Sequence, residues 1–354
     1  MNSKGEETNQ SPIIKATGVT ESERYLNKLC QNTFLSLWSY PCLYKNQGSG
    51  RISGGSKELC DLIVFFEKHI IIFSDKDCVF PNTGDIELDW NRWFKSAIEE
   101  GADQIYGAEK WIKQHPDRIF IDRECTQKFP LKVPHPTEAI FHRIAVAHGA
   151  SKRCKEVLGG SGSLILDPSI VGKAHKIIFS EGQPFVIGQI NSEKGYVHVF
   201  DEITLDIILT TVDTISDFTR YLSKKEQLIL NGKLKRAKGE EDLLAYYLQN
   251  YDSEGYLHEF VVPFSVEQLE IEEGQWEIFN KSDKRLNQIE VNKISYYWDD
   301  LIEDFNESIL DRTIHASSQE NVAEQALVIH LLAREDRTRR RILARELYKL
   351  SNKA

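Results

Sequence analysis

The most regular pattern of apolar and polar positions lies in residues 58–77, which read ELCDLIVFFEKHIIIFSDKD. Two short apolar runs, residues 62–66 and 70–73, are separated by the polar residues 67–69. Both runs are rich in β-branched and aromatic side chains, which favour buried strands. The pattern therefore predicts two antiparallel strands joined by a tight turn.

Helical and strand periodicities frame this hairpin. Residues 20–40 and 89–114 place apolar side chains at helical spacing, and a proline follows each segment. The glycine-rich residues 46–56 predict a loop, and residues 118–122 predict a short strand. The order of helix, hairpin, helix and strand is typical of an α/β domain, which we expect to end at the proline-rich residues 129–136.

The second half of the chain mixes strands and helices. We expect strands at 139–147 and 163–166, a hairpin of 184–190 with 196–200, helices at 205–222 and 242–249, and a helical segment at 295–353. The chain is thus expected to comprise a flexible tail (1–19), an α/β domain (20–134), an α+β domain (135–290) and a helical tail (291–354) with an arginine-rich last helix.

Composition narrows the classes of function. The chain has 354 residues, of which 41% are hydrophobic, and its formal net charge is -10. A nucleic acid would therefore have to meet a local basic patch and not the surface as a whole. No apolar run reaches the roughly 18 residues of a transmembrane helix, and the N-terminus lacks the apolar centre of a signal peptide, so we expect a cytoplasmic protein without membrane contact.

A local basic patch is present in the last predicted helix. Arg339, Arg340 and Arg341 are consecutive there, and clustered arginines supply the sequence-independent part of affinity for nucleic acids. These residues are our candidates for contact with phosphates. The alternatives are a solvated helix face and a contact with another subunit.

Other residues that could carry chemistry are assigned structural roles. His142 and His148 fall on one face of a predicted strand without a third metal ligand. Residues 159–162 (GGSG) lack the lysine and serine that end a phosphate-binding loop, so they predict a turn. The six cysteines form no CxxC pair and are expected to be reduced, buried thiols.

The hairpin carries the clearest candidate chemistry. The start of one antiparallel strand lies beside the end of the next, so Asp61 and Lys76 are expected at the same edge of the sheet. In metal-assisted hydrolysis of phosphodiesters, a carboxylate holds a divalent cation, and a lysine can stabilise charge or position water. The alternative for this pair is a salt bridge at the strand edge.

The segment from Glu58 to Asp61 (ELCD), followed by residues 70–76 (IIIFSDK), resembles the core of the PD-(D/E)xK restriction-endonuclease-like superfamily. The resemblance covers residues 20–125. It implies a mixed sheet flanked by helices, with Asp61 as the hairpin aspartate, Lys76 as the lysine, and Mg²⁺ (or Mn²⁺) as the cofactor. It also implies that Gln104, on the following helix, faces the site. The alternative for Gln104 is an exposed amide on an ordinary amphipathic helix.

This sequence departs from the family's pattern at one position. Ser74 stands where a carboxylate is expected, and strand alternation places Ser74 and Lys76 on one face with Asp75 pointing away. The family sometimes adds a ligand from its first helix. Candidates for the second carboxylate are therefore Glu58, Asp75, and Glu21 or Glu23 of the first predicted helix. The expected metal ligands are Asp61, Glu58 and Glu23, although Glu23 also matches a helix-capping residue.

These observations lead to a divalent-metal-dependent nuclease as the expected function, with DNA as the substrate that the family implies. Defence of bacteria against foreign DNA is the setting suggested by family analogy. A second copy of the chain, or a partner protein of a defence system, is the further partner considered. Two alternatives stay open: a catalytically inactive nuclease fold that binds nucleic acid or serves as an assembly subunit, and a protein-interaction module built on the middle domain.

Overall fold

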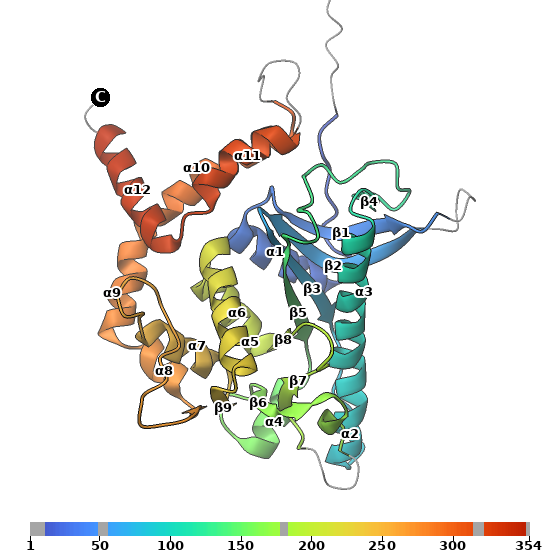
Figure 1. The fold of residues 1–354 in the computed structure, drawn as a ribbon, viewed down its shortest axis with the longest axis vertical. Coiled ribbons are helices and arrows are strands. Elements are labelled where there is room, and N and C mark those ends of the chain that lie inside the picture. Colours follow the sequence, from blue (N-terminus) through green and yellow to red (C-terminus); the bar gives the residue numbers. More distant parts are fainter. Residues whose placement is uncertain (1–10, 49–55, 178–182, 314–321, 352–354) are drawn as a thin grey trace, which may run out of the picture.

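The computed structural model describes residues 11–48, 56–177, 183–313 and 322–351. The protein is an α/β protein with two mixed sheets of six and four strands, flanked by helices, and with a helical C-terminal region (Figure 1). The strands are β1 (Ser39–Asn46), β2 (Ser56–Phe66), β3 (His69–Lys76), β4 (Ile119–Phe120), β5 (Ile140–Ala147), β6 (Ile165–Val171), β7 (Val186–Gln189), β8 (Val197–Asp201), β9 (Leu234–Ala237) and β10 (Leu269–Ile271).

Helices cover the sheets and form the C-terminal region, where α12 points away from the sheets and α11 returns toward the six-stranded sheet (Figure 1), with His330 against Phe66 of β2. The helices are α1 (Glu21–Phe34), α2 (Ile86–Trp93), α3 (Glu100–Gln114), α4 (Ser151–Leu158), α5 (Glu202–Thr211), α6 (Ile215–Leu230), α7 (Glu240–Gln249), α8 (Gln275–Asn280), α9 (Asp283–Asn292), α10 (Tyr296–Leu310), α11 (Val322–Ala333) and α12 (Arg337–Ser351). None of the helices in the described ranges is long and apolar enough to cross a membrane.

The six-stranded sheet has the order β4-β1-β2-β3-β5-β8. Strands β1, β2 and β3 form an antiparallel meander, whereas β5 runs parallel to β3 and β8 runs parallel to β5. Helix α3 packs on one face of this sheet, where an ion pair fixes it: Glu109 accepts bonds from Arg143 of β5 at 2.6 and 2.7 Å. Helix α1 packs on the other face, where Phe34 contacts Phe73 of β3.

The predicted hairpin is confirmed. Strands β2 and β3 are nearly all buried, and they pair in antiparallel register from Leu62 opposite Phe73 to Phe66 opposite His69. The strand expected at 139–147 is also confirmed, as β5. The helix expected at 242–249 corresponds to α7.

The helix expected at 20–40 is too long, because it ends at Phe34 and the chain enters strand β1 at Ser39. Leu35 adopts a positive φ of 67°, which stops the helix. Pro41, expected to terminate a helix, instead lies within β1. Its missing N–H is tolerated there because the outer strand β4 pairs with β1 only at residues 44 and 45.

Several expected elements of the later chain are also corrected. The expected hairpin of 184–190 with 196–200 does not form, since β7 belongs to the four-stranded sheet and β8 to the six-stranded one. The helix expected at 205–222 is two helices, α5 and α6. The helix expected at 89–114 contains a π-helical turn at Phe94–Glu99.

The strand expected at 118–122 is reduced to the two-residue β4, which pairs with β1. The boundary expected after residue 134 lies inside the six-stranded sheet, because β5 and β8 follow it in the chain yet pair beside β3. Most of the loop expected at 46–56 and the first part of the expected tail lie outside the described residues. Within the tail, the Ile13 N–H donates to the Leu310 carbonyl at 2.8 Å.

Candidate functional site

The structure brings Asp61, Lys76 and Gln104 together at one edge of the six-stranded sheet. Asp61 lies in β2 just before the paired residues, and Lys76 ends β3, so the antiparallel register places the two side by side. The distance from Lys76 Nζ to Asp61 Oδ2 is 3.8 Å. Gln104 reaches the pair from α3, as the resemblance implied.

Four polar side chains form one hydrogen-bonded network at this edge. The Gln104 amide donates to Asp61 Oδ1 at 2.9 Å, and its carbonyl accepts from Lys76 Nζ at 2.6 Å. The Ser74 hydroxyl lies 3.2 Å from Asp61 Oδ2 and 3.1 Å from Gln104 Oε1. Gly101 of α3 faces the same network, since a Cβ added there would be in van der Waals contact with Ser74 Oγ at 3.4 Å. The lysine amine is thereby held beside a buried carboxylate.

Asp75 contributes its backbone to the site but not its side chain. Its N–H donates to Asp61 Oδ2 at 2.6 Å, while its carboxylate pairs with His148 Nε2 at 2.7 Å. Burial lowers the pKa of His148, but the hydrogen bond and charge of Asp75 outweigh this and raise it. Asp75 is therefore not the missing second carboxylate. Its partner His148 was not expected, although it continues the alternation of β5.

A β-bulge in β2 places Glu58 on the same face as Asp61. Residues 43 and 44 of β1 pair with residues 60 and 58, so Leu59 is an extra residue without a partner. In a regular strand, Glu58 and Asp61 would point to opposite faces, because three positions separate them. The bulge shifts the alternation by one. Glu58 is therefore the better-placed candidate for a second carboxylate.

The two carboxylates share a partly desolvated environment. Burial raises the pKa of Asp61, and the positive charge of Lys76 opposes that effect. Burial raises the pKa of Glu58 as well, and the negative charge of Asp61 adds to the rise. Glu58 Oε1 is buried without a hydrogen-bond partner in the described part of the chain. Both groups would gain from a nearby cation.

The first-helix glutamates do not join the site in this structure. Glu23 forms a capping box with Thr20, and its carboxylate accepts from the Val19 N–H at 2.6 Å. Its charge nevertheless contributes to the raised pKa of Asp61 and of Glu58. Glu21 is exposed in the first turn of α1. The capping interpretation of Glu23 is thus confirmed.

The residues at this site could hold a magnesium ion only if substrate and water supplied its other ligands. Within the described ranges, no group of three His, Cys, Asp or Glu side chains could hold a metal ion. Mg²⁺ is commonly bound by one or two carboxylates together with substrate phosphates and water, and it does not require an all-protein cage. Asp61 and Glu58, with its unpartnered buried oxygen, match that smaller donor set.

The arginine cluster divides into exposed and buried members. Arg340 is buried, with 1% of its surface exposed, and its guanidinium donates to Asp299 at 2.7 Å. It is therefore not available to phosphates, contrary to expectation, because it joins α12 to α10. The Arg339 side chain is 68% exposed. Arg341 donates to Asn292 at 3.1 Å.

The two histidines considered earlier lie apart. His142 Nε2 lies 3.0 Å from His69 Nδ1, and burial lowers the pKa of His142 to about 3. His148 instead pairs with Asp75.

Comparisons with models of protein families, with curated proteins and with solved structures found no match for this chain.

Proposed function

We propose that this protein is a divalent-metal-dependent nuclease that hydrolyses phosphodiester bonds in DNA, built on a restriction-endonuclease-like arrangement in its N-terminal part. The observation that carries the proposal is the Asp61–Lys76 pair, which Gln104 joins at one sheet edge. The order of α1, the meander β1–β3, α3 and the parallel strand β5 supports it, since the family also places a helix before the hairpin and a helix and strand after it.

Each residue of the cluster has a role in this proposal. Asp61 and Glu58 would hold Mg²⁺ (or Mn²⁺), which when bound polarises a phosphate and acidifies water. Lys76 keeps 26% of its side chain exposed, so its amine can meet a phosphate oxygen of the substrate. Gln104 positions that amine, because its carbonyl oxygen accepts a hydrogen bond from Lys76 Nζ at 2.6 Å. Ser74 holds Asp61 in place.

The decisive experiment is cleavage of plasmid DNA in the presence of Mg²⁺ by the Lys76→Ala variant. We expect a loss of about 10²-fold or more, because the variant removes a cation aimed at developing charge. Lys110→Ala is the matched control, since it removes the same charge from the exposed side of α3. Equal cleavage by the wild type and Lys76→Ala, with the same unfolding midpoint, would refute the assignment.

The second candidate function is a nuclease fold without catalysis that binds nucleic acid or serves as an assembly subunit. It is favoured because both oxygens of Asp61 already accept hydrogen bonds and Ser74 replaces a carboxylate. Titration calorimetry with Mn²⁺ separates the two candidates. Binding that is lost in Asp61→Asn and strengthened in Ser74→Asp supports the enzyme, whereas DNA binding by a chain that takes up no Mn²⁺ supports the alternative.

A DNA partner also receives support from the region around α12. Arg339 and Arg341 line a cavity of about 540 Å³ together with Tyr251 and Tyr256, and Tyr256 is 80% exposed. Cations beside exposed aromatic rings suit phosphates and unstacked bases. In this proposal Arg339→Gln with Arg341→Gln weakens DNA retention and flattens its salt dependence. Defence against foreign DNA is the setting that the family resemblance suggests for such an activity.

A further inference from the structure

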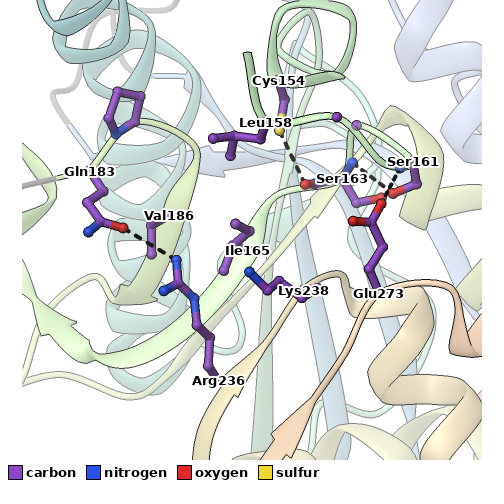
Figure 2. A pocket seen from close by; sticks show the side chains of 13 residues that line it. Cys154, Leu158, Ser161, Ser163, Ile165, Gln183, Val186, Arg236, Lys238 and Glu273 are labelled. Carbon is purple, nitrogen blue, oxygen red and sulfur yellow. Dashed lines mark hydrogen bonds between the residues drawn. The ribbon is translucent and has the colours of Figure 1, made fainter. Parts of the chain in front are cut away.

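A second candidate site lies in the four-stranded sheet, away from Asp61. It is a cavity of about 290 Å³ between the glycine loop that follows α4 and strands β6, β7 and β9 (Figure 2). The glycine loop is residues 159–162, which the sequence predicted as a turn. Polar and apolar side chains from four segments of the chain (154–165, 183–186, 236–238 and residue 273) line the cavity. None of them takes part in the proposed nuclease site.

Two cations, an arginine and a lysine, line this cavity. Arg236 and Lys238, from β9 and the residue after it, line the cavity, and neither forms an ion pair within the described residues. Arg236 Nε is buried and lacks a hydrogen-bond partner in the same part of the chain. Its Nη2 makes one long contact, 3.4 Å, with Gln183 Oε1. By contrast, the neighbouring Lys235 points outward and pairs with Glu270 at 2.8 Å.

Glu273, the acid that lines the cavity, is held by the glycine loop on the side opposite the two cations. Figure 2 shows Glu273 directed to the glycine loop, where its carboxylate accepts from the Ser161 N–H at 2.9 Å. Gly160 makes room for it, since a Cβ at that position would lie 1.4 Å from Glu273 Oε1. Glu273 is therefore engaged by the loop and does not pair with Lys238. Among the described residues, no carboxylate balances the positive charge of the opposite side.

An apolar surface adjoins the two cations. Ile165 of β6, Val186 of β7 and Leu158 at the end of α4 form this apolar part of the cavity lining (Figure 2). A half-buried guanidinium with free donors binds phosphate in a planar, directional way, and a lysine adds a point charge. The apolar walls suit an apolar or aromatic body attached to that anion.

We infer that this cavity binds a small molecule in which a phosphate monoester is attached to an apolar or aromatic body. The phosphate lies between Arg236 and Lys238, Gln183 adds a polar contact, and the body of the ligand lies against Ile165 and Val186. The inference does not depend on the proposed nuclease activity. It assigns the second sheet a ligand-binding role that the chemistry at Asp61 does not require.

The test is titration calorimetry on the full chain with phenyl phosphate as the probe. We expect binding that the double variant Arg236→Gln/Lys238→Gln weakens by about tenfold or more, since each lost charged hydrogen bond costs roughly that factor. The matched control is Lys233→Gln/Lys235→Gln, which removes the same charge from neighbouring positions outside the cavity. We expect the control to bind as the wild type does.

Further probes separate the parts of the ligand. Inorganic phosphate should bind more weakly than phenyl phosphate, because it lacks the apolar body, and benzyl alcohol should not bind at all. Equal unfolding midpoints of the two double variants show that the folds are comparable. Wild-type affinity in Arg236→Gln/Lys238→Gln, an equal loss in the control, or tighter binding of benzoate than of phenyl phosphate would each overturn the inference.

Discussion

Asp61 and Arg236 are both charged side chains on interior strands of the two sheets, yet their surroundings differ. Asp61 accepts hydrogen bonds from Gln104, Ser74 and the backbone of Asp75, so its charge is satisfied within the protein. Arg236 keeps a buried Nε without a partner in the described part of the chain, and Lys238 beside it has no ion pair there. Asp61 is thus fully hydrogen-bonded within the protein, whereas among the described residues Arg236 and Lys238 have no acid to pair with.

The difference separates structural from binding contributions. Removing a member of a balanced network leaves its partners buried and unsatisfied, so stability falls whether or not the site is catalytic. Removing a charged side chain that has no ion-pair partner leaves no other group unsatisfied. The free energy of unfolding should then hardly change, while ligand affinity should fall. Variants of the two regions therefore test opposite expectations with the same unfolding measurement.

The largest effect is expected for Asp61→Ala. It leaves the buried Asp75 N–H and the half-buried Gln104 amide without their acceptor, so we expect a loss of about 3 to 4 kcal/mol in the free energy of unfolding. Urea denaturation followed by circular dichroism measures it. Asp61→Asn keeps the size of the side chain and one acceptor oxygen, and it should lose about half as much. A loss below about 1 kcal/mol for Asp61→Ala would show that the network is not balanced as described.

The next largest effect is a pH dependence of stability caused by Glu241, which is hydrogen-bonded to Ser163 just after the glycine loop. Burial raises the pKa of Glu241 from 4.5 to about 7, although Ser163 donates to its carboxylate at 2.9 Å. The folded state thus holds the proton more tightly than the unfolded state does. The Glu241 contribution to stability is full below about pH 4.5 and is lost as the pH rises through about 7, by up to about 3 kcal/mol.

Glu241→Gln removes this titration. We expect the variant to be more stable than the wild type at pH 8 and to differ little from it at pH 4, when unfolding is measured at both values. Asp201, whose pKa burial raises to about 6, remains in the variant, so part of the pH dependence persists. An equal difference between the variant and the wild type at both pH values would contradict the prediction.

A smaller effect is expected for Gly160→Ala in the loop. Gly160 has a φ of 68°, and the new Cβ would displace the Glu273 carboxylate from the Ser161 N–H. We expect a loss of about 1.5 kcal/mol from backbone strain and from the lost hydrogen bond. Gly232→Ala has a similar positive φ but nothing within 4 Å, so it reports the strain alone. A larger loss in the control would contradict the role given to Glu273.

The smallest effect on stability is expected for Arg236→Gln/Lys238→Gln. Because neither cation has a carboxylate partner in the described ranges, the free energy of unfolding should change by less than about 0.5 kcal/mol. Thermal and urea unfolding of this variant and of Lys233→Gln/Lys235→Gln should coincide. A loss of about 2 kcal/mol would show that the pair supports the fold, and the contrast with Asp61 would fail.

Part of the candidate site was predictable because it depends on local pattern. Continuous apolar runs required β2 and β3, and antiparallel pairing then placed Asp61 beside Lys76. Gln104 came from the family resemblance. The position of Glu58 was not predictable, since a single unpaired residue, Leu59, decides which face it joins. No apolar or polar pattern marks such a bulge.

The same limit applies to long-range order. Strands β7 and β8 are close in the sequence and read as a hairpin, but pairing with different sheets separates them. Arg340 reads as one of three equivalent arginines, and only packing of α12 against α10 buries it.

The sequence by itself determined the α/β character, the buried hairpin and the identities of the acid and the lysine at its edge, because hydrophobic runs and strand pairing act over short distances. The tertiary structure alone decided that β5 and β8 complete the first sheet and that Glu58 shares a face with Asp61. It alone also brought Arg236, Lys238 and the glycine loop around one cavity, since these segments meet only through packing of the second sheet.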